Sequence, residues 1–254
     1  MSILLFRLLS WITGILAFIA ATWQWSRPLD YPWPLVIFLA WDAFALALTV
    51  WRRLPWREAL EKTVPSLLAL AAIALRFLLA ETALERWTLT VLFVLIPFLV
   101  LELLFLLSFA PARYPVNGLS RLNIALLPVG AFFLGAALNG LNVFLRLPFW
   151  VTLAAFIPFV GLGFYLTAHP SADYRHRWRW TFFGGVIGLH AGLIGLLLPV
   201  GMLVHGAVAS FLVGFPLRVR RYAYPPRPSR RLAWGEGIAA VVLLAGILLS
   251  SRWA

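Results

Sequence analysis

Cysteine is absent from the 254-residue sequence, and lysine nearly so, since Lys62 stands alone beside 20 arginines. The lack of cysteine excludes disulfides, thiolate metal sites, iron–sulfur clusters and cysteine nucleophiles. The lack of lysine from the later apolar segments excludes a retinal Schiff base. There is also no Walker sequence, no His-Glu-x-x-His and no aspartate-rich prenyl-diphosphate motif. Any ATP-driven role would therefore need a separate subunit.

Charge is scarce as well, because only 12% of the residues are charged while 63% are hydrophobic and the mean hydropathy is +0.92. Soluble domains are about one quarter charged and about half apolar. A soluble core of this size cannot hide so much apolar surface, so lipid must be the solvent for much of the chain. The composition predicts an all-α, polytopic integral membrane helical bundle. No linker is long enough to separate two domains, so we expect a single transmembrane domain over residues 1–254.

The apolar segments predict about nine transmembrane helices, each near the roughly 20 residues that a span requires. Their predicted ranges are 3–22, 33–51, 64–80, 88–109, 122–143, 149–168, 181–198, 200–217 and 235–251. The count falls to eight if the first is a cleaved signal peptide, but its length and the bulky Trp23 and Trp25 that follow it favour an uncleaved span.

The seventh and eighth spans come from one run, Thr181 to Leu217, that contains no Asp, Glu, Lys or Arg. As a single helix this run would be about 55 Å long at about 1.5 Å per residue. The hydrocarbon layer is only about 30 Å thick. We therefore predict a helical hairpin that turns at Pro199-Val200-Gly201, because proline and glycine interrupt helices.

The basic residues predict the orientation in the membrane. With a cytoplasmic N-terminus, 16 of the 21 basic residues fall on the cytoplasmic side of the predicted spans, four fall on the other side, and Arg76 lies within a span. The four are Arg27, Arg86, Arg146 and Arg252. This asymmetry is the positive-inside pattern, and most of the 13 tryptophans lie at span ends, as in an aromatic belt. The net charge of +12 is thus explained without nucleic acid, and we expect a prokaryotic cytoplasmic (inner) membrane.

The segment 218–234 is predicted to be a basic, proline-containing cytoplasmic loop. Its arginines either set the topology alone or also bind the head groups of anionic lipids. They are Arg218, Arg220, Arg221, Arg227, Arg230 and Arg231. The lipid bilayer is the expected partner, and other membrane subunits are a further possibility.

Five titratable residues stand out inside the predicted spans, where ionisable groups are expensive and often functional: Asp42, Arg76, Glu102, His190 and His205. Arg76 is near the outer end of its span, so we expect its side chain to extend to the interface. By residue count, Asp42 and the two histidines lie at similar depths. A tight hairpin would place the histidines opposite each other, because their midpoint is close to the predicted turn. A His–His pair, with or without Asp42, could hold zinc, non-haem iron or haem, or relay protons.

A structural interpretation of the histidines stays open beside these. A neutral histidine in a helical bundle can hydrogen-bond a group on a neighbouring helix. The 15-residue spacing of His190 and His205 matches no standard ligand motif. Gly184, Gly188 and Gly192 lie along one helix face and predict a close approach of two helices there. We therefore expect both histidines to face protein and not lipid.

The segment Leu101-Glu102-Leu103-Leu104-Phe105 faintly resembles the glutamate motif of intramembrane CAAX-type proteases, which also use histidines on later helices. The resemblance implies a lipid- or peptide-directed membrane enzyme with Glu102, His190 and His205 at its site. The second glutamate and the arginine of that motif are absent. Ile194 and Ala209 stand four residues after the histidines, where the relatives have polar residues.

Three functional classes remain. The first is a transport or permease-type subunit that uses Asp42, Glu102, His190 and His205 as a polar path. The second is a structural or assembly subunit of a larger membrane complex. The third is a membrane enzyme. The small amount of chain outside the spans favours the first two over an enzyme.

Overall fold

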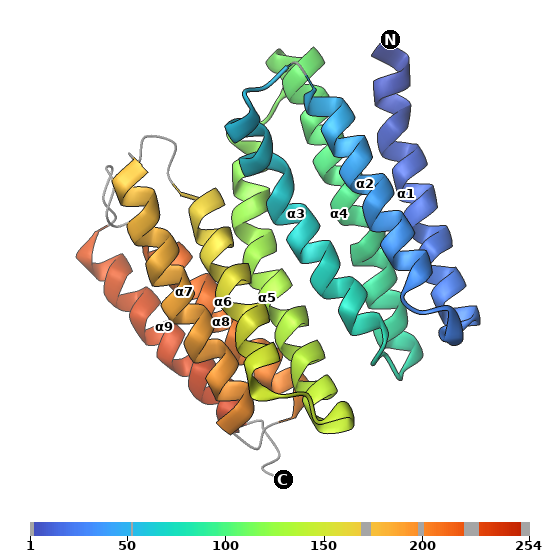
Figure 1. Ribbon diagram of the computed structural model, residues 1–254. Coiled ribbons are helices and arrows are strands. Elements are labelled where there is room, and N and C mark those ends of the chain that lie inside the picture. Colours follow the sequence, from blue (N-terminus) through green and yellow to red (C-terminus); the bar gives the residue numbers. More distant parts are fainter. Residues whose placement is uncertain (1–2, 52, 169–173, 198–200, 221–228, 250–254) are drawn as a thin grey trace. The chain divides into compact units, whose positions relative to one another are not determined.

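The structure is a computed structural model that describes residues 3–51, 53–168, 174–197, 201–220 and 229–249 (Figure 1). The described residues form nine α-helices and two short 3₁₀ turns, without β-strands. The helices are α1 (Ile3–Ser26), α2 (Trp33–Val50), α3 (Trp56–Phe77), α4 (Ala83–Phe109), α5 (Gly118–Leu145), α6 (Phe149–Leu166), α7 (Tyr174–Leu197), α8 (Met202–Val219) and α9 (Arg230–Leu249).

Eight of these nine described helices are long and apolar enough to cross a membrane, and the predicted polytopic helical bundle is confirmed. The exception is α3, which was predicted as the span 64–80 but begins at Trp56. Its first turns are charged, and Glu58 pairs with Lys62 one turn later at 3.2 Å. An acidic residue in the first turn and an i,i+4 ion pair both favour helix formation, so the helix extends beyond the apolar stretch.

Contacts between residues divide the chain into two compact units, residues 1–126 and residues 127–254, with the boundary inside α5. Unit 1 contains α1 to α4 and the start of α5. Unit 2 contains the rest of α5 and α6 to α9. The prediction of a single transmembrane domain over residues 1–254 stays a prediction.

In unit 1, α1 packs along α4 and also contacts α2, while α3 packs on α4 and α2. The pairing of α1 with α4 is antiparallel, since Phe6 meets Phe109 near one end and Trp25 meets Trp87 near the other. Phe93 of α4 fills the centre, with its ring centroid 4.9 Å from that of Phe38. Aromatic contacts of this kind add about 0.5–1.5 kcal/mol beyond the burial of their area.

Arg76, near the end of α3, is buried and forms an ion pair with Glu85 in the first turn of α4. Its guanidinium also donates to the carbonyl of Leu79 at 3.0 Å. A buried arginine needs such partners, because an uncompensated charge away from water is costly. The pair connects α3 to α4 where the chain turns between them.

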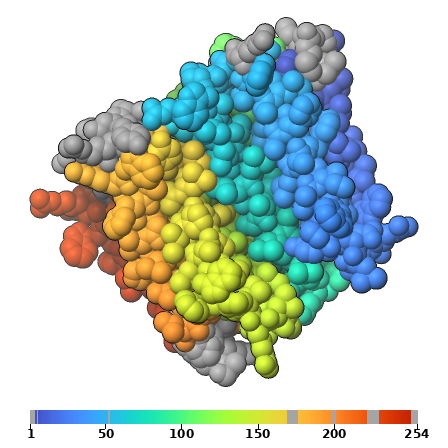
Figure 2. Space-filling view, in the orientation of Figure 1, coloured from blue at the N-terminus to red at the C-terminus, as the bar shows by residue number. Residues whose placement is uncertain are grey.

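In unit 2, the closest packing joins α6 and α7, whose side chains adjoin along the face drawn in Figure 2. A Cβ atom at Gly188 would lie 2.6 Å from the carbonyl oxygen of Phe156, and one at Gly184 would lie 2.8 Å from the side chain of Phe164. The predicted close approach along the glycine face is confirmed, and the helix that it admits is α6.

The charge-free run divides into two helices, because α7 ends at Leu197 and α8 begins at Met202. The predicted turn falls mostly on residues 198–200, which lie outside the described residues. Helix α7 starts at Tyr174, seven residues before the predicted span. Helical structure also enters both ends of the predicted loop 218–234, since α8 continues to Val219 and α9 begins at Arg230.

Candidate functional site

Asp42 lies on the buried face of α2, in line with Phe38, Leu46 and Thr49. Its side chain has no exposed surface, and neither carboxyl oxygen has a hydrogen-bond partner among the described residues. A buried polar group without a partner costs about 1–3 kcal/mol, and more when it is charged. A carboxyl group kept at that cost in the middle of a span is the strongest functional candidate in unit 1.

The residue before Asp42 makes a polar contact with α1. The indole Nε1 of Trp41 donates to Oγ1 of Thr13 at 3.1 Å, and Thr13 is itself completely buried. Hydroxyl groups inside a membrane bundle are usually satisfied by their own helix. Here the Thr13 hydroxyl accepts a bond from α2. Helices α1 and α2 therefore share a polar contact within one residue of the buried carboxyl group.

Glu102 of α4 is half-buried and also meets α1, because Oγ of Ser10 lies 3.3 Å from its Oε2. The Ser10 hydroxyl is buried and within 3.0 Å of the carbonyl oxygen of Arg7 as well, so one proton serves two acceptors. The sequence showed no basic partner for Glu102 at its own depth. The structure gives it a neutral hydroxyl partner instead.

Ser10 and Thr13 are three residues apart on α1, so they lie on one face and about 4.5 Å apart along the helix axis. They connect the contact at Glu102 with the contact at Trp41. We call Ser10, Thr13, Trp41, Asp42 and Glu102 the polar seam. It consists of two carboxyl groups, two hydroxyl groups and the indole N–H of Trp41. Sequence reasoning identified the two acids but missed Ser10 and Thr13, whose only signal was their spacing.

His205 of α8 is completely buried in unit 2 and joins three helices. Its Nδ1 lies 3.0 Å from the carbonyl oxygen of Gly135 on α5, and its Nε2 lies 3.0 Å from that of Ala191 on α7. The ring of Phe156 on α6 is 5.9 Å away between centroids. Gly195 leaves the space that the ring occupies, since a Cβ there would overlap it.

These contacts limit what His205 can do. A neutral imidazole has one N–H, so it donates to one of the two carbonyls, whereas the doubly protonated ring donates to both. In either form both nitrogens face main-chain oxygens. The ring thus acts as a hydrogen-bonded joint between α5, α7 and α8. Asn139 makes another bond from a side chain to the main chain of a neighbouring helix. Its Nδ2 on α5 donates to the carbonyl of Gly195 on α7 at 3.2 Å.

His190 is placed differently. Its side chain is exposed, and its Nδ1 lies 2.7 Å from the carbonyl oxygen of Val186 on its own helix. At 3.6 residues per turn it lies about 100° around α7 from Ala191, which contacts His205. The expectation that both histidines face protein is therefore confirmed for His205 and wrong for His190. Because His190 is one residue before Ala191 on α7, its side chain points away from the face that contacts His205.

In the described parts of the chain, no group of three or more His, Asp or Glu residues is placed to hold a metal ion. Asp42 and Glu102 belong to unit 1 and the histidines to unit 2. A metal or haem at His190 and His205 stays a prediction, which metal analysis of the purified protein can test.

The predicted head-group arginines have different surroundings. The guanidinium of Arg218 binds Oε1 of Glu236 through Nε at 2.9 Å and Nη2 at 2.8 Å, which ties α8 to α9. Arg220 is mostly buried and lies over the ring of Trp180, 5.9 Å from its centroid. Arg230 and Arg231 are exposed. Arg221 and Arg227 lie outside the described residues. Binding of anionic lipid by this group stays a prediction.

Comparison of the chain with known protein families, with curated proteins and with solved structures finds no match.

Proposed function

We propose that this multi-pass membrane protein is a transport-type subunit that moves protons along the polar seam of unit 1. The observation that carries the proposal is Asp42, fully buried in a membrane helix with both carboxyl oxygens lacking partners among the described residues. A carboxyl group is tolerated in hydrocarbon while it is neutral and binds a cation when it is charged. This exchange makes intramembrane acids the usual elements of proton relays.

The rest of the seam supports this role. Glu102 lies at the level of Ser10, and Thr13 and Trp41 bridge α1 and α2 next to Asp42. The contact at Glu102 and the contact at Trp41, the residue before Asp42, are thus about one helical turn apart along α1. A hydroxyl group both donates and accepts, so it can pass a proton between two carboxyl groups. An aliphatic side chain at position 10 or 13 could not.

Flux through liposomes tests the proposal. The full chain is reconstituted with an internal pH-sensitive dye, and a potassium gradient with valinomycin drives proton entry. We expect Asp42→Asn to reduce the initial rate by about tenfold or more, because the amide cannot carry a proton between sites. Glu102→Gln should also reduce it, because an amide at this position cannot take up and release a proton, even though Ser10 can still hydrogen-bond it.

Glu81→Gln is the matched control, because it also removes one carboxylate but at an exposed position before α4. It should keep the wild-type rate. Full flux in Asp42→Asn, or wild-type flux no higher than that of protein-free liposomes, would contradict the proposal.

A second candidate, a subunit of a larger membrane assembly, is supported by α9. Among its residues only Ala240 is buried, so the helix offers nearly its whole apolar surface to neighbours. This candidate is favoured if the wild-type protein shows no proton flux. It also requires that the assembly extracted in mild detergent has the same size with Asp42→Asn as with wild type.

A further inference from the structure

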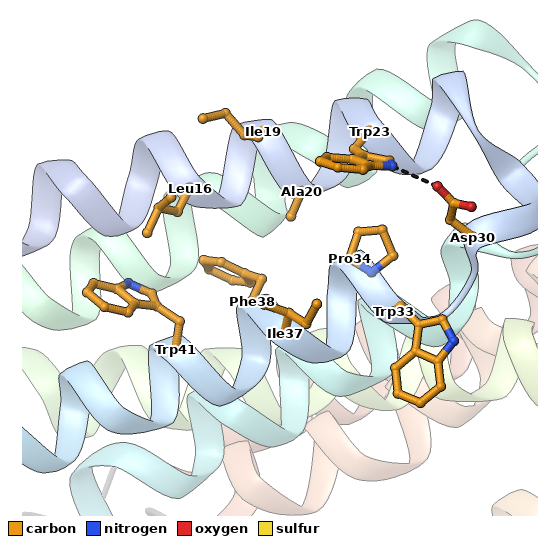
Figure 3. A pocket seen from close by; sticks show the side chains of 10 residues that line it. All are labelled: Leu16, Ile19, Ala20, Trp23, Asp30, Trp33, Pro34, Ile37, Phe38 and Trp41. Atoms are coloured by element: carbon orange, nitrogen blue, oxygen red, sulfur yellow. Dashed lines mark hydrogen bonds between the residues drawn. The ribbon is translucent and has the colours of Figure 1, made fainter.

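Helices α1 and α2, with the turn between them, line a cavity of about 410 Å³ within unit 1 (Figure 3). Its lining is aromatic or apolar except for Asp30, and three tryptophans contribute to it, Trp23, Trp33 and Trp41. Trp23 and Trp33 are 49% and 66% exposed, so the cavity is an open groove. From the sequence, tryptophans were interpreted only as an aromatic belt at the span ends.

The groove runs from the end of the spans toward the middle of the membrane. Trp33 begins α2 and Trp41 lies eight residues further along it, which corresponds to about 12 Å of helix. The hydrocarbon layer is about 30 Å thick, so the groove lies within one leaflet. Its length and lining suit a lipid acyl chain that enters alongside Trp23.

A second, polar cavity of about 330 Å³ adjoins the groove. Ile19 and Trp23 line both, and the second is completed by Thr22, Ser26 and Arg27. The guanidinium carbon of Arg27 lies 5.9 Å from the centre of the Trp23 ring. The indole Nε1 of Trp23 donates to Oδ2 of Asp30 at 2.9 Å.

The guanidinium of Arg27 thus lies over the Trp23 ring and the carboxylate of Asp30 lies at its indole N–H, and both residues stand between the end of α1 and the start of α2. Among the described residues neither Arg27 nor Asp30 forms an ion pair. One carboxyl oxygen of Asp30 accepts from Trp23, which leaves the second oxygen to meet a donor from a ligand. A ligand with one anionic and one cationic group beside an apolar chain complements this arrangement.

We propose that the α1–α2 groove binds a phospholipid with a zwitterionic head group that carries a primary ammonium, as phosphatidylethanolamine does. The acyl chain lies along the tryptophans, the phosphate meets Arg27 and the ammonium donates to Asp30. A quaternary ammonium has no N–H to donate, and an anionic glycerol head group has no cation for Asp30. This site shares Trp41 with the polar seam, but its head-group contacts use neither Asp42 nor Glu102.

Native mass spectrometry of the full chain in mild detergent tests the site, by titration with phosphatidylethanolamine, phosphatidylcholine and phosphatidylglycerol of identical acyl chains. We expect one phosphatidylethanolamine to bind with a dissociation constant about tenfold lower than the other two, as one charge-assisted hydrogen bond allows. Equal binding of the three lipids, or a preference for phosphatidylglycerol, would overturn the proposal.

Two variants separate the head-group contacts. Asp30→Asn keeps an acceptor for Trp23 and should abolish the preference for phosphatidylethanolamine over phosphatidylcholine. Arg27→Gln should weaken both lipids alike, because both carry the phosphate. Glu81→Gln, which removes a carboxylate outside the groove, should change neither, and circular dichroism checks that each variant keeps its helices. A preference that survives in Asp30→Asn would show that the ammonium is not bound there.

Discussion

Replacing Gly188 by alanine should destabilise unit 2 by about 2–3 kcal/mol, the upper part of the range for overpacking a close contact. The new Cβ would lie 2.6 Å from the carbonyl oxygen of Phe156 and 3.0 Å from Cα of Ile157. These are main-chain atoms of α6, so no side chain can rotate to make room. Helices α6 and α7 must therefore move apart. Because their interface is the most extensive in unit 2, this movement costs much packing.

Gly246→Ala on α9 is the matched control, because nothing lies within 4 Å of a Cβ at that position. It should be neutral or stabilising by up to about 1 kcal/mol, since alanine is the better helix former. The free energy of unfolding of both variants is measured by denaturant titration in detergent micelles. Equal stability of the two would mean that α6 and α7 are not in close contact.

We also expect His205→Ala to lose about 3 kcal/mol or more of folding free energy. The substitution leaves a cavity among four helices and removes a ring that contacts the carbonyls of Gly135 and Ala191. Large-to-small changes at buried positions cost about 2–5 kcal/mol. His205→Gln should lose less, because its amide can still donate to one of the carbonyls.

His190→Ala serves as the comparison and should change stability by less than about 0.5 kcal/mol, as exposed substitutions do. If His205→Ala is as stable as His190→Ala, the ring does not hold the helices together. The same purified proteins can be analysed for metal and haem. A stoichiometric cofactor in wild type that is missing from both variants would favour the cofactor hypothesis and would contradict a purely structural role for His205.

The sequence alone determined that the chain is a helical membrane protein and where most of its helices lie. Hydrocarbon offers no hydrogen bonds to the main chain, so each long apolar segment has to be a helix. Length then required the run from Thr181 to Leu217 to divide, and α7 and α8 show that it does. The start of α3 was missed, because charged residues outside the apolar stretch continue the same helix.

Only the tertiary structure decided which face of each helix meets protein. In a soluble helix the polar face marks solvent, but in a membrane both the lipid-facing and the protein-facing sides are apolar, so periodicity does not separate them. Hence the sequence did not distinguish the exposed His190 from the buried His205, and it identified the glycine face of α7 without its partner α6. Ser10 reaches Glu102 across 92 residues, and no local pattern encodes that contact.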